Sequence, residues 1–134
     1  MRKFLALWTT PLLLTIAWPS ASSADADAGK ELFESAESGN CVTCHHTTAL
    51  NKVGPGLQDV SERHSEQWLH SWMKDPQGTW RSEHPETLEL RERTSKLRTR
   101  MTSCVKKPMP EQGVMNLIDY LGTLVSEPLP EAGD

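Results

Sequence analysis

Three residues of one short segment have the types and spacing to do chemistry, because Cys41, Cys44 and His45 form a Cys-x-x-Cys-His motif. Two thiols at this spacing can each add to a vinyl group of one porphyrin, and the histidine that follows can then reach the iron. Covalent attachment of a c-type haem uses this arrangement. The motif therefore predicts one haem c, bound through the two cysteines, with His45 as an axial ligand.

Two other interpretations of the cysteine pair fit the rest of the chain less well. A Cys-x-x-Cys redox disulfide of the thioredoxin kind occurs beside a βαβ pattern, and the sequence contains no such pattern. A structural zinc site needs four ligands, and no second Cys/His pair at finger spacing follows the first. Haem attachment remains the interpretation that the sequence favours.

Residues 1–24 are typical of a secretory signal peptide. Arg2 and Lys3 supply the positive start, residues 4–18 form an apolar core, and a run of small residues follows as a cleavage site. The apolar core is shorter than the ~20 residues that span a bilayer, and no later segment is long enough. We expect export to a bacterial periplasm, where haem is attached, and a mature domain of residues 25–134 without a membrane span.

The mature chain is short and poor in aromatic residues. Its roughly 110 residues fit one domain. The full chain has one Tyr, two Phe and five Trp, and two of the Trp lie in the signal segment. So small an aromatic core is marginal for a domain of this size. A haem would supply a large apolar body around which short helices could pack.

Apolar periodicity and capping residues predict an all-α domain with about four short helices and no strand. A rigid Gly-Pro-Gly turn at residues 54–56 lies in the loop after the motif, and residues 77–85 are turn-like. The predicted helices cover residues 27–38, 65–74, 86–101 and 111–125. The third has only a narrow apolar stripe, so we expect it at the surface or against a partner.

Charge is unevenly distributed along the chain. From residue 25 onward there are 12 basic and 18 acidic residues, a net charge of −6, yet residues 91–107 hold seven basic residues against Glu92 alone. Such a segment can steer a redox partner of opposite charge, or it can be a solvated helix face. Binding of nucleic acid is not expected of an exported, net acidic chain.

Four elements in this order resemble the class I c-type cytochromes. They are a first helix that leads into Cys41-Val42-Thr43-Cys44-His45, the loop Gly54-Pro55-Gly56-Leu57, the segment Met109-Pro110, and a last helix containing Tyr120-Leu121. The resemblance implies a cytochrome c-like fold wrapped around one covalently bound haem, with Phe33 and Tyr120 in contact where the first and last helices cross and Gly29 allowing close approach. Residues 77–107 exceed what the family needs and are expected to be an insert with an extra basic helix.

The resemblance also implies roles for five residues. Cys41 and Cys44 would carry the thioethers, His45 would be the proximal ligand and Met109 the distal one, and the Pro55 carbonyl would accept the His45 Nδ1 proton. A second-shell acceptor fixes the imidazole ring, and a thioether ligand raises the reduction potential. With both axial positions filled, the implied function is transfer of single electrons between redox proteins, as a soluble carrier or as a subunit of an oxidoreductase.

Other methionines and histidines compete for the distal position. Met101 is the main alternative to Met109 as the distal ligand. It lies at the end of the third predicted helix, only eight residues before Met109. Met73 and Met115 are expected in the core. The remaining histidines are expected at the surface without a role; these are His46, His64, His70 and His84.

The third cysteine, Cys104, does not fit a minimal electron carrier. It lies close to Arg100, Lys106 and Lys107, and such neighbours lower the pKa of a thiol and raise its reactivity. An alternative function follows, in which the protein is the haem subunit of an enzyme that oxidises sulfur compounds, with Cys104 or an open iron site in catalysis. Whether the protein is an enzyme stays open at this point.

Overall fold

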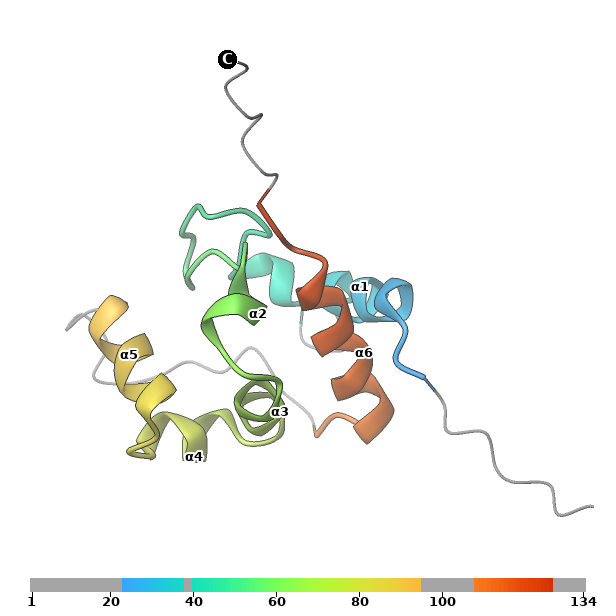
Figure 1. Cartoon of the computed structure of the whole chain (residues 1–134). Helices are drawn as coiled ribbons and strands as arrows, with labels where there is room; N and C mark the ends of the chain where they lie inside the picture. Colours follow the sequence, from blue (N-terminus) through green and yellow to red (C-terminus); the bar gives the residue numbers. More distant parts are fainter. Residues whose placement is uncertain (1–22, 38–39, 95–107, 127–134) are drawn as a thin grey trace, which may run out of the picture.

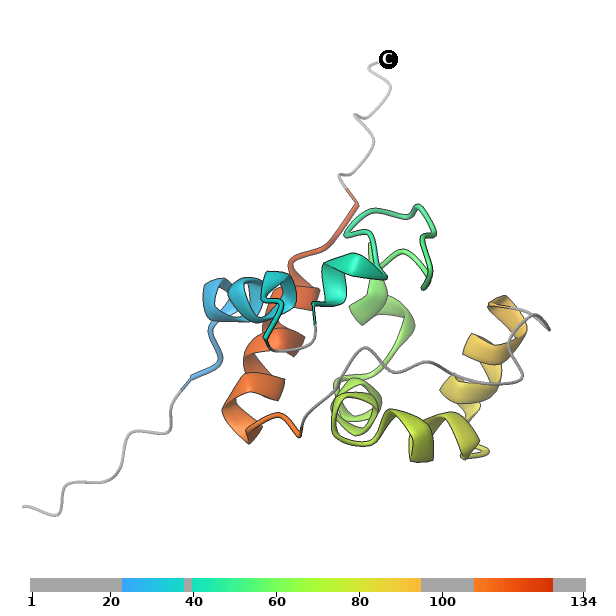
Figure 2. The same ribbon diagram turned by 180° about the vertical axis from the view of Figure 1, so that it is seen from behind.

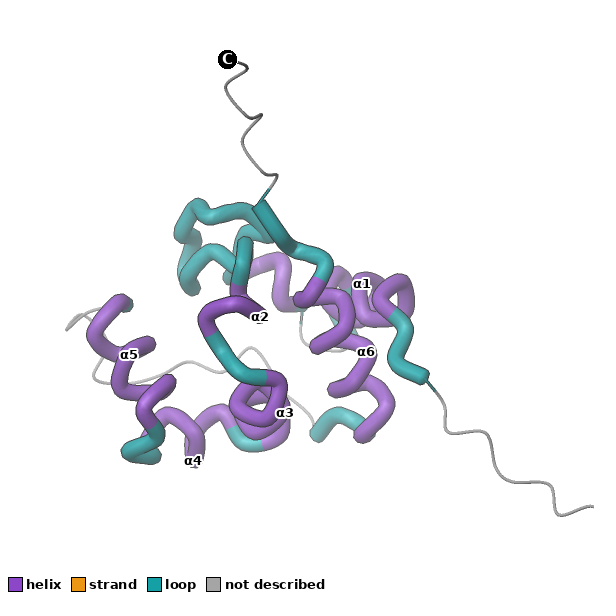
Figure 3. The backbone as a smooth tube through the Cα atoms, viewed as in Figure 1, coloured by secondary structure: helices purple, strands orange, loops and turns teal. Residues whose placement is uncertain are grey.

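A computed structural model describes residues 23–37, 40–94 and 108–126, and within them the chain is all-helical, as the sequence predicted. Figure 1 shows the order of the helices, and Figure 3 shows that loops and turns join them within the described ranges. No helix in these ranges is long and apolar enough to span a bilayer. The elements are α1 (Ala26–Glu34), the 3₁₀ turn η1 (Cys41–Thr43), α2 (Val60–Arg63), α3 (Glu66–Lys74), α4 (Pro76–Arg81), α5 (Pro85–Arg93) and α6 (Glu111–Gly122).

The helices begin where the sequence provides caps. Asp25 Oδ1 accepts hydrogen bonds from the first amides of α1, and Ser65 Oγ accepts one from Trp68 N at the start of α3. The predicted helices at 65–74 and 111–125 correspond to α3 and α6, whereas α1 ends four residues before its predicted end at residue 38. The predicted third helix corresponds to α5 up to Arg93, and its expected continuation lies outside the described residues.

The expectation of turns at residues 77–85 was wrong for most of that range, because Pro76–Arg81 forms α4 and only residues 82–84 lie between two helices. Asp75 caps this helix by accepting a hydrogen bond from Gly78 N at 2.9 Å, and Pro76 occupies the first turn, where its missing N–H costs nothing. A helix of six residues is too short to show apolar periodicity. The only sequence features that indicate α4 are therefore the capping residue Asp75 and the proline that follows it.

The first and last helices cross at close range, as expected. The rings of Phe33 and Tyr120 lie 5.5 Å apart and tilted by 56°. An added Cβ on Gly29 would lie 2.0 Å from the Asn116 carbonyl oxygen of α6. Phe33, Leu117 and Tyr120 form a buried group that we call the crossing cluster. It fixes α1, and with it the chain that leads into η1, against α6.

A second buried group lies where α3 meets its neighbours. Figures 1 and 2 show α3 between α6 on one side and α4 and α5 on the other. Leu90 of α5 is buried in this group while Leu88 is exposed, so α5 lies at the surface of the domain with its narrow apolar stripe facing inward, as the sequence predicted. We call the group the central cluster; its members are Val60, Trp68, Leu69, Leu90, Val114, Ile118 and Leu121.

Helices α4 and α5, which we call the arm, are attached to α3 by polar contacts, one of which is buried. The Trp68 indole Nε1 donates to Thr87 Oγ1 at 2.9 Å, and both side chains are buried. Ser65 at the start of α3 donates from its N and its Oγ to the Glu86 carboxylate, at 2.8 and 2.7 Å. These contacts hold the arm against α3.

Replacing Thr87 by valine tests this attachment. Valine keeps the shape but removes the acceptor of the Trp68 N–H, which would stay buried without a partner. We expect a loss of about 1–2 kcal/mol in the free energy of unfolding, measured by urea denaturation. Thr123→Val is the control, since Thr123 Oγ1 only donates to the Tyr120 carbonyl one turn earlier. Equal effects of the two substitutions would contradict the attachment.

Candidate functional site

The Cys41–His45 motif is wound into one tight turn. Asn40 adopts a left-handed conformation, with φ 50°, and starts η1. The Cys41 carbonyl then accepts from Cys44 N at 3.0 Å and from His45 N at 2.9 Å. Both cysteines are half-buried free thiols. The turn therefore presents two thiols and one imidazole from adjacent positions.

The ionisation of Cys41 differs from that of a redox-active cysteine. Burial raises the pKa of the Cys41 thiol, and the charge of Cys44 raises it further, although a backbone hydrogen bond opposes both effects. The attacking cysteine of a thioredoxin-like pair instead has a depressed pKa. The Cys41 thiol therefore lacks the depressed pKa that activates such a cysteine.

The His45 ring is held from outside the motif. Its Nδ1 lies 2.8 Å from the Pro55 carbonyl oxygen, the contact that the resemblance implied. A carbonyl can only accept, so Nδ1 carries the proton and the lone pair resides on Nε2, the atom that can ligate a metal. An added Cβ on Gly54 would lie 2.4 Å from His45 Cε1. Only glycine at this position leaves room for the ring.

Backbone bonds keep the 46–58 loop against the motif. Gly54 N donates to the Cys44 carbonyl at 2.7 Å, and Leu57 N donates to the His46 carbonyl at 2.9 Å. These two bonds flank Pro55 on either side. The position of the Pro55 carbonyl beside His45 is therefore fixed by the loop's own hydrogen bonds.

Met109 lies in an extended segment just before α6. It is partly buried and contacts both clusters, and Cys41 contacts the crossing cluster as well. A Cβ on Gly113 would lie 3.0 Å from Met109 Cγ and 3.4 Å from its sulfur, so glycine there lets the Met109 side chain pack closely against the first turn of α6. The fold thus brings Cys41 and Met109, distant in the sequence, against the same cluster.

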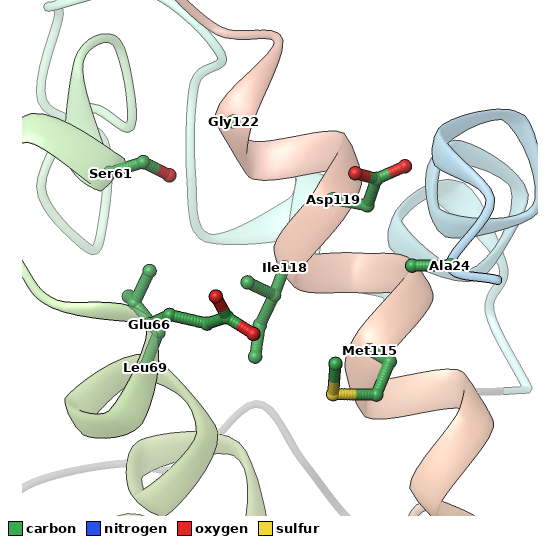
Figure 4. A pocket seen from close by; sticks show the side chains of 8 residues that line it. All are labelled: Ala24, Ser61, Glu66, Leu69, Met115, Ile118, Asp119 and Gly122. Carbon is green, nitrogen blue, oxygen red and sulfur yellow. The ribbon is translucent and has the colours of Figure 1, made fainter.

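The other methionines are placed differently. Met73 is on α3 and also contacts both clusters, so it is the closest structural competitor of Met109. Met115 lines a hollow of about 330 Å³ between α2, α3 and α6, and Figure 4 shows it on the same helix as Ile118 and Asp119, which also line the hollow. Neither Cys41 nor Met109 lines that hollow. Met101 lies outside the described residues.

Arg63 is a candidate that the sequence analysis missed. Its Nη1 donates to the Gln58 carbonyl at 2.5 Å and its Nη2 to the Gly56 carbonyl at 3.3 Å. Its Nε is buried and has no hydrogen-bond partner within the described ranges. Burial lowers the pKa of the guanidinium, and the nearby Arg93 adds to that effect. A half-buried cation with one buried, unsatisfied N–H is suited to an anionic ligand group.

These features fit the haem that the motif predicts. Two thiols, an imidazole with its proton on Nδ1 and a thioether are the donor types that bind a c-type haem. The guanidinium of Arg63 suits the carboxylates that a haem carries at its edge. Apolar side chains suit its flat faces, and four of them touch both clusters while staying only partly buried: Leu57, Met73, Met109 and Leu124.

The structure corrects the expected exposure of one histidine. His64 was expected at the surface but is 4 % exposed. His70 is half-buried, and its Nε2 lies 2.5 Å from Glu111 Oε1 at the start of α6. His46 and His84 are exposed, as expected. Burial of His64 could not be read from its polar sequence neighbours.

The basic segment is partly engaged inside the domain. Arg91 donates to the Trp80 carbonyl and lies over the Trp80 ring, 5.3 Å from its centroid. Arg93 donates to Glu89 at 2.8 Å. The other five basic residues of 91–107, and Cys104 with them, lie outside the described residues.

Comparisons with known proteins agree with this site. A family model described as cytochrome c matches residues 26–124, which is most of the chain. The matched range contains the whole of η1, the Pro55 loop and Met109. No match was found among curated proteins or among solved structures.

Proposed function

The chain belongs to the cytochrome c family, and from this premise we propose that it is a periplasmic carrier of single electrons, or the electron-transfer subunit of an oxidoreductase. As a c-type cytochrome it holds haem c covalently. The bound haem supplies a one-electron Fe(III)/Fe(II) couple. The observation that carries the proposal is the match over residues 26–124, which spans the attachment motif and both proposed axial ligands.

Within this proposal the protein's residues attach and orient the haem. Cys41 and Cys44 would form the thioethers, and His45 would ligate the iron through Nε2. Pro55 keeps the proton on Nδ1 and fixes the ring, which strengthens the imidazole as a donor. Met109 would be the distal ligand, and its soft sulfur would favour Fe(II) and raise the reduction potential.

Other residues control charge and water around the haem. We assign to Arg63 the binding of a haem carboxylate, because its buried N–H otherwise lacks a partner among the described residues. Leu57 and Leu124 cover apolar haem surface together with the methionines. Exclusion of water strengthens the electrostatic interactions inside the site.

Location and partners follow from the sequence. Residues 1–24 serve as the signal peptide that delivers residues 25–134 to the periplasm. Redox proteins with an acidic surface are the proposed partners, steered by the basic segment 91–107. The arm within residues 77–107 is the insert of this domain relative to a minimal family member.

Replacing Met109 by alanine tests the carrier function. In the haem-loaded wild type, two filled axial positions should make carbon monoxide bind slowly to the ferrous protein. Met109→Ala should lose the far-red methionine–ferric charge-transfer band, lower the reduction potential and bind carbon monoxide rapidly. Absorption spectroscopy, potentiometry and stopped-flow mixing measure the three effects.

Met73→Ala is the matched control, because Met73 contacts the same two clusters. It should keep the band. Retention of the band in Met109→Ala would exclude Met109 as the ligand, and Met101→Ala would be examined next. Rapid binding of carbon monoxide to the untouched protein would instead support an open iron site and the enzyme hypothesis.

A further inference from the structure

His64 is a buried histidine that the haem site does not use. It follows α2 directly, and its ring stacks on Trp68 of α3 at 4.2 Å between centroids and 19° between planes. From α5, Arg93 Nη2 lies 3.3 Å from His64 Nε2, and Glu86 Oε2 lies 3.3 Å from His64 Nδ1. One imidazole thus joins the body of the domain to the arm.

The hydrogen-bonding groups assign the protonation state of this ring. Arginine can only donate, so the contact with Arg93 requires a lone pair on His64 Nε2. The ring proton is then on Nδ1, which faces Glu86, although their contact falls short of hydrogen-bond geometry. The observed packing therefore requires a neutral imidazole.

A second proton would oppose this packing. It would occupy Nε2, remove the acceptor for Arg93 and place a positive ring beside the guanidinium. On α5, Glu86 and Glu89 face His64 and offset part of this repulsion. On α2, the Arg63 guanidinium lies near Arg93 and Glu89 and adds further positive charge. Helix α3 contributes the uncharged Trp68 ring.

We propose that His64 is a pH-sensitive lock, which in its neutral form holds α5 against the domain and on protonation releases this helix. Release would uncover the side of α3 that carries Trp68. The lock does not depend on which methionine ligates the haem.

The direction of the pH effect follows from burial. Burial lowers the pKa of His64, and Arg93 lowers it further, while Glu89 and Glu86 oppose them. In the released state His64 would regain its ordinary pKa of about 6.5. The released state therefore takes up a proton that the closed state resists, and closure weakens as pH falls below about 6.5. Above that value the lock stays closed.

Hydrogen exchange of the haem-loaded protein tests the lock. With rates corrected for the intrinsic effect of pH, the amides of residues 85–93 should lose protection by up to about tenfold for each pH unit below 6.5, the limit for one proton. The amides of α1 and α6 should change far less. Protection of α5 that does not vary with pH would overturn the proposal.

Two variants and a second measurement isolate His64. In His64→Gln the side chain can still accept from Arg93 but cannot titrate, so the protection of α5 should become independent of pH. His70→Gln removes the half-buried histidine of α3 and should keep the wild-type dependence. If His64→Gln does not fold, NMR of the wild-type ring decides, since a charged or Nε2-protonated His64 at neutral pH would equally refute the lock.

Discussion

Gly54→Ala should convert the haem-loaded protein from a low-spin form to one that has lost its His45 ligand, although the haem stays covalently bound. The added Cβ would lie 2.4 Å from His45 Cε1 and 2.8 Å from both ring nitrogens. These separations are shorter than atoms tolerate, and the backbone of Gly54 is held by its bond to the Cys44 carbonyl. The imidazole must therefore move away.

The displaced ring would also lose its bond to the Pro55 carbonyl. Loss of such an outer-shell partner alone weakens metal ligation by about 10- to 100-fold. The ferric absorption and electron paramagnetic resonance spectra report the spin state, and staining of the denatured protein for haem shows that both thioethers remain. These readouts separate ligation from attachment.

Pro55→Ala is the informative comparison. The acceptor of the His45 proton is the backbone carbonyl, which alanine retains, so this variant should remain low-spin. A wild-type spectrum in Gly54→Ala would show that His45 is not the proximal ligand in the position described. A high-spin spectrum in both variants would assign the effect to the loop as a whole.

Gly29→Ala should give the largest loss of stability among the substitutions considered, about 3 kcal/mol in the free energy of unfolding. The new Cβ would lie 2.0 Å from the Asn116 carbonyl oxygen and 2.6 Å from its carbon, both in the backbone of α6. A helix backbone cannot yield as a flexible side chain does. The crossing of α1 and α6 would have to open, with loss of contact between Phe33 and Tyr120.

Gly122→Ala provides the control within the same helix pair. The nearest atom to its added Cβ would be Ser61 Oγ at 4.0 Å, so alanine fits without strain. Alanine also favours helix by up to about 1 kcal/mol relative to glycine. Urea denaturation of the haem-loaded variants compares the two. A loss in Gly29→Ala no greater than in Gly122→Ala would contradict the close approach.

The sequence alone determined the features that depend on neighbours along the chain. The spacing of Cys41, Cys44 and His45 lies within one turn, and the apolar period of α6 repeats within one helix. Both patterns can be read without knowledge of the fold. The order of the attachment motif, the Gly-Pro loop and the Met-Pro segment likewise predicted the family before any helix was placed.

The tertiary structure decided what depends on residues brought together from distant parts of the chain. His64 is buried and Arg63 has a buried Nε, although both residues stand in a polar stretch and nothing local marks either feature. Their surroundings are created when α5 packs on α3 through Trp68 and Thr87. Burial and the resulting pKa shifts arise only from such long-range contacts, because desolvation depends on all the atoms around a group and not on its sequence neighbours.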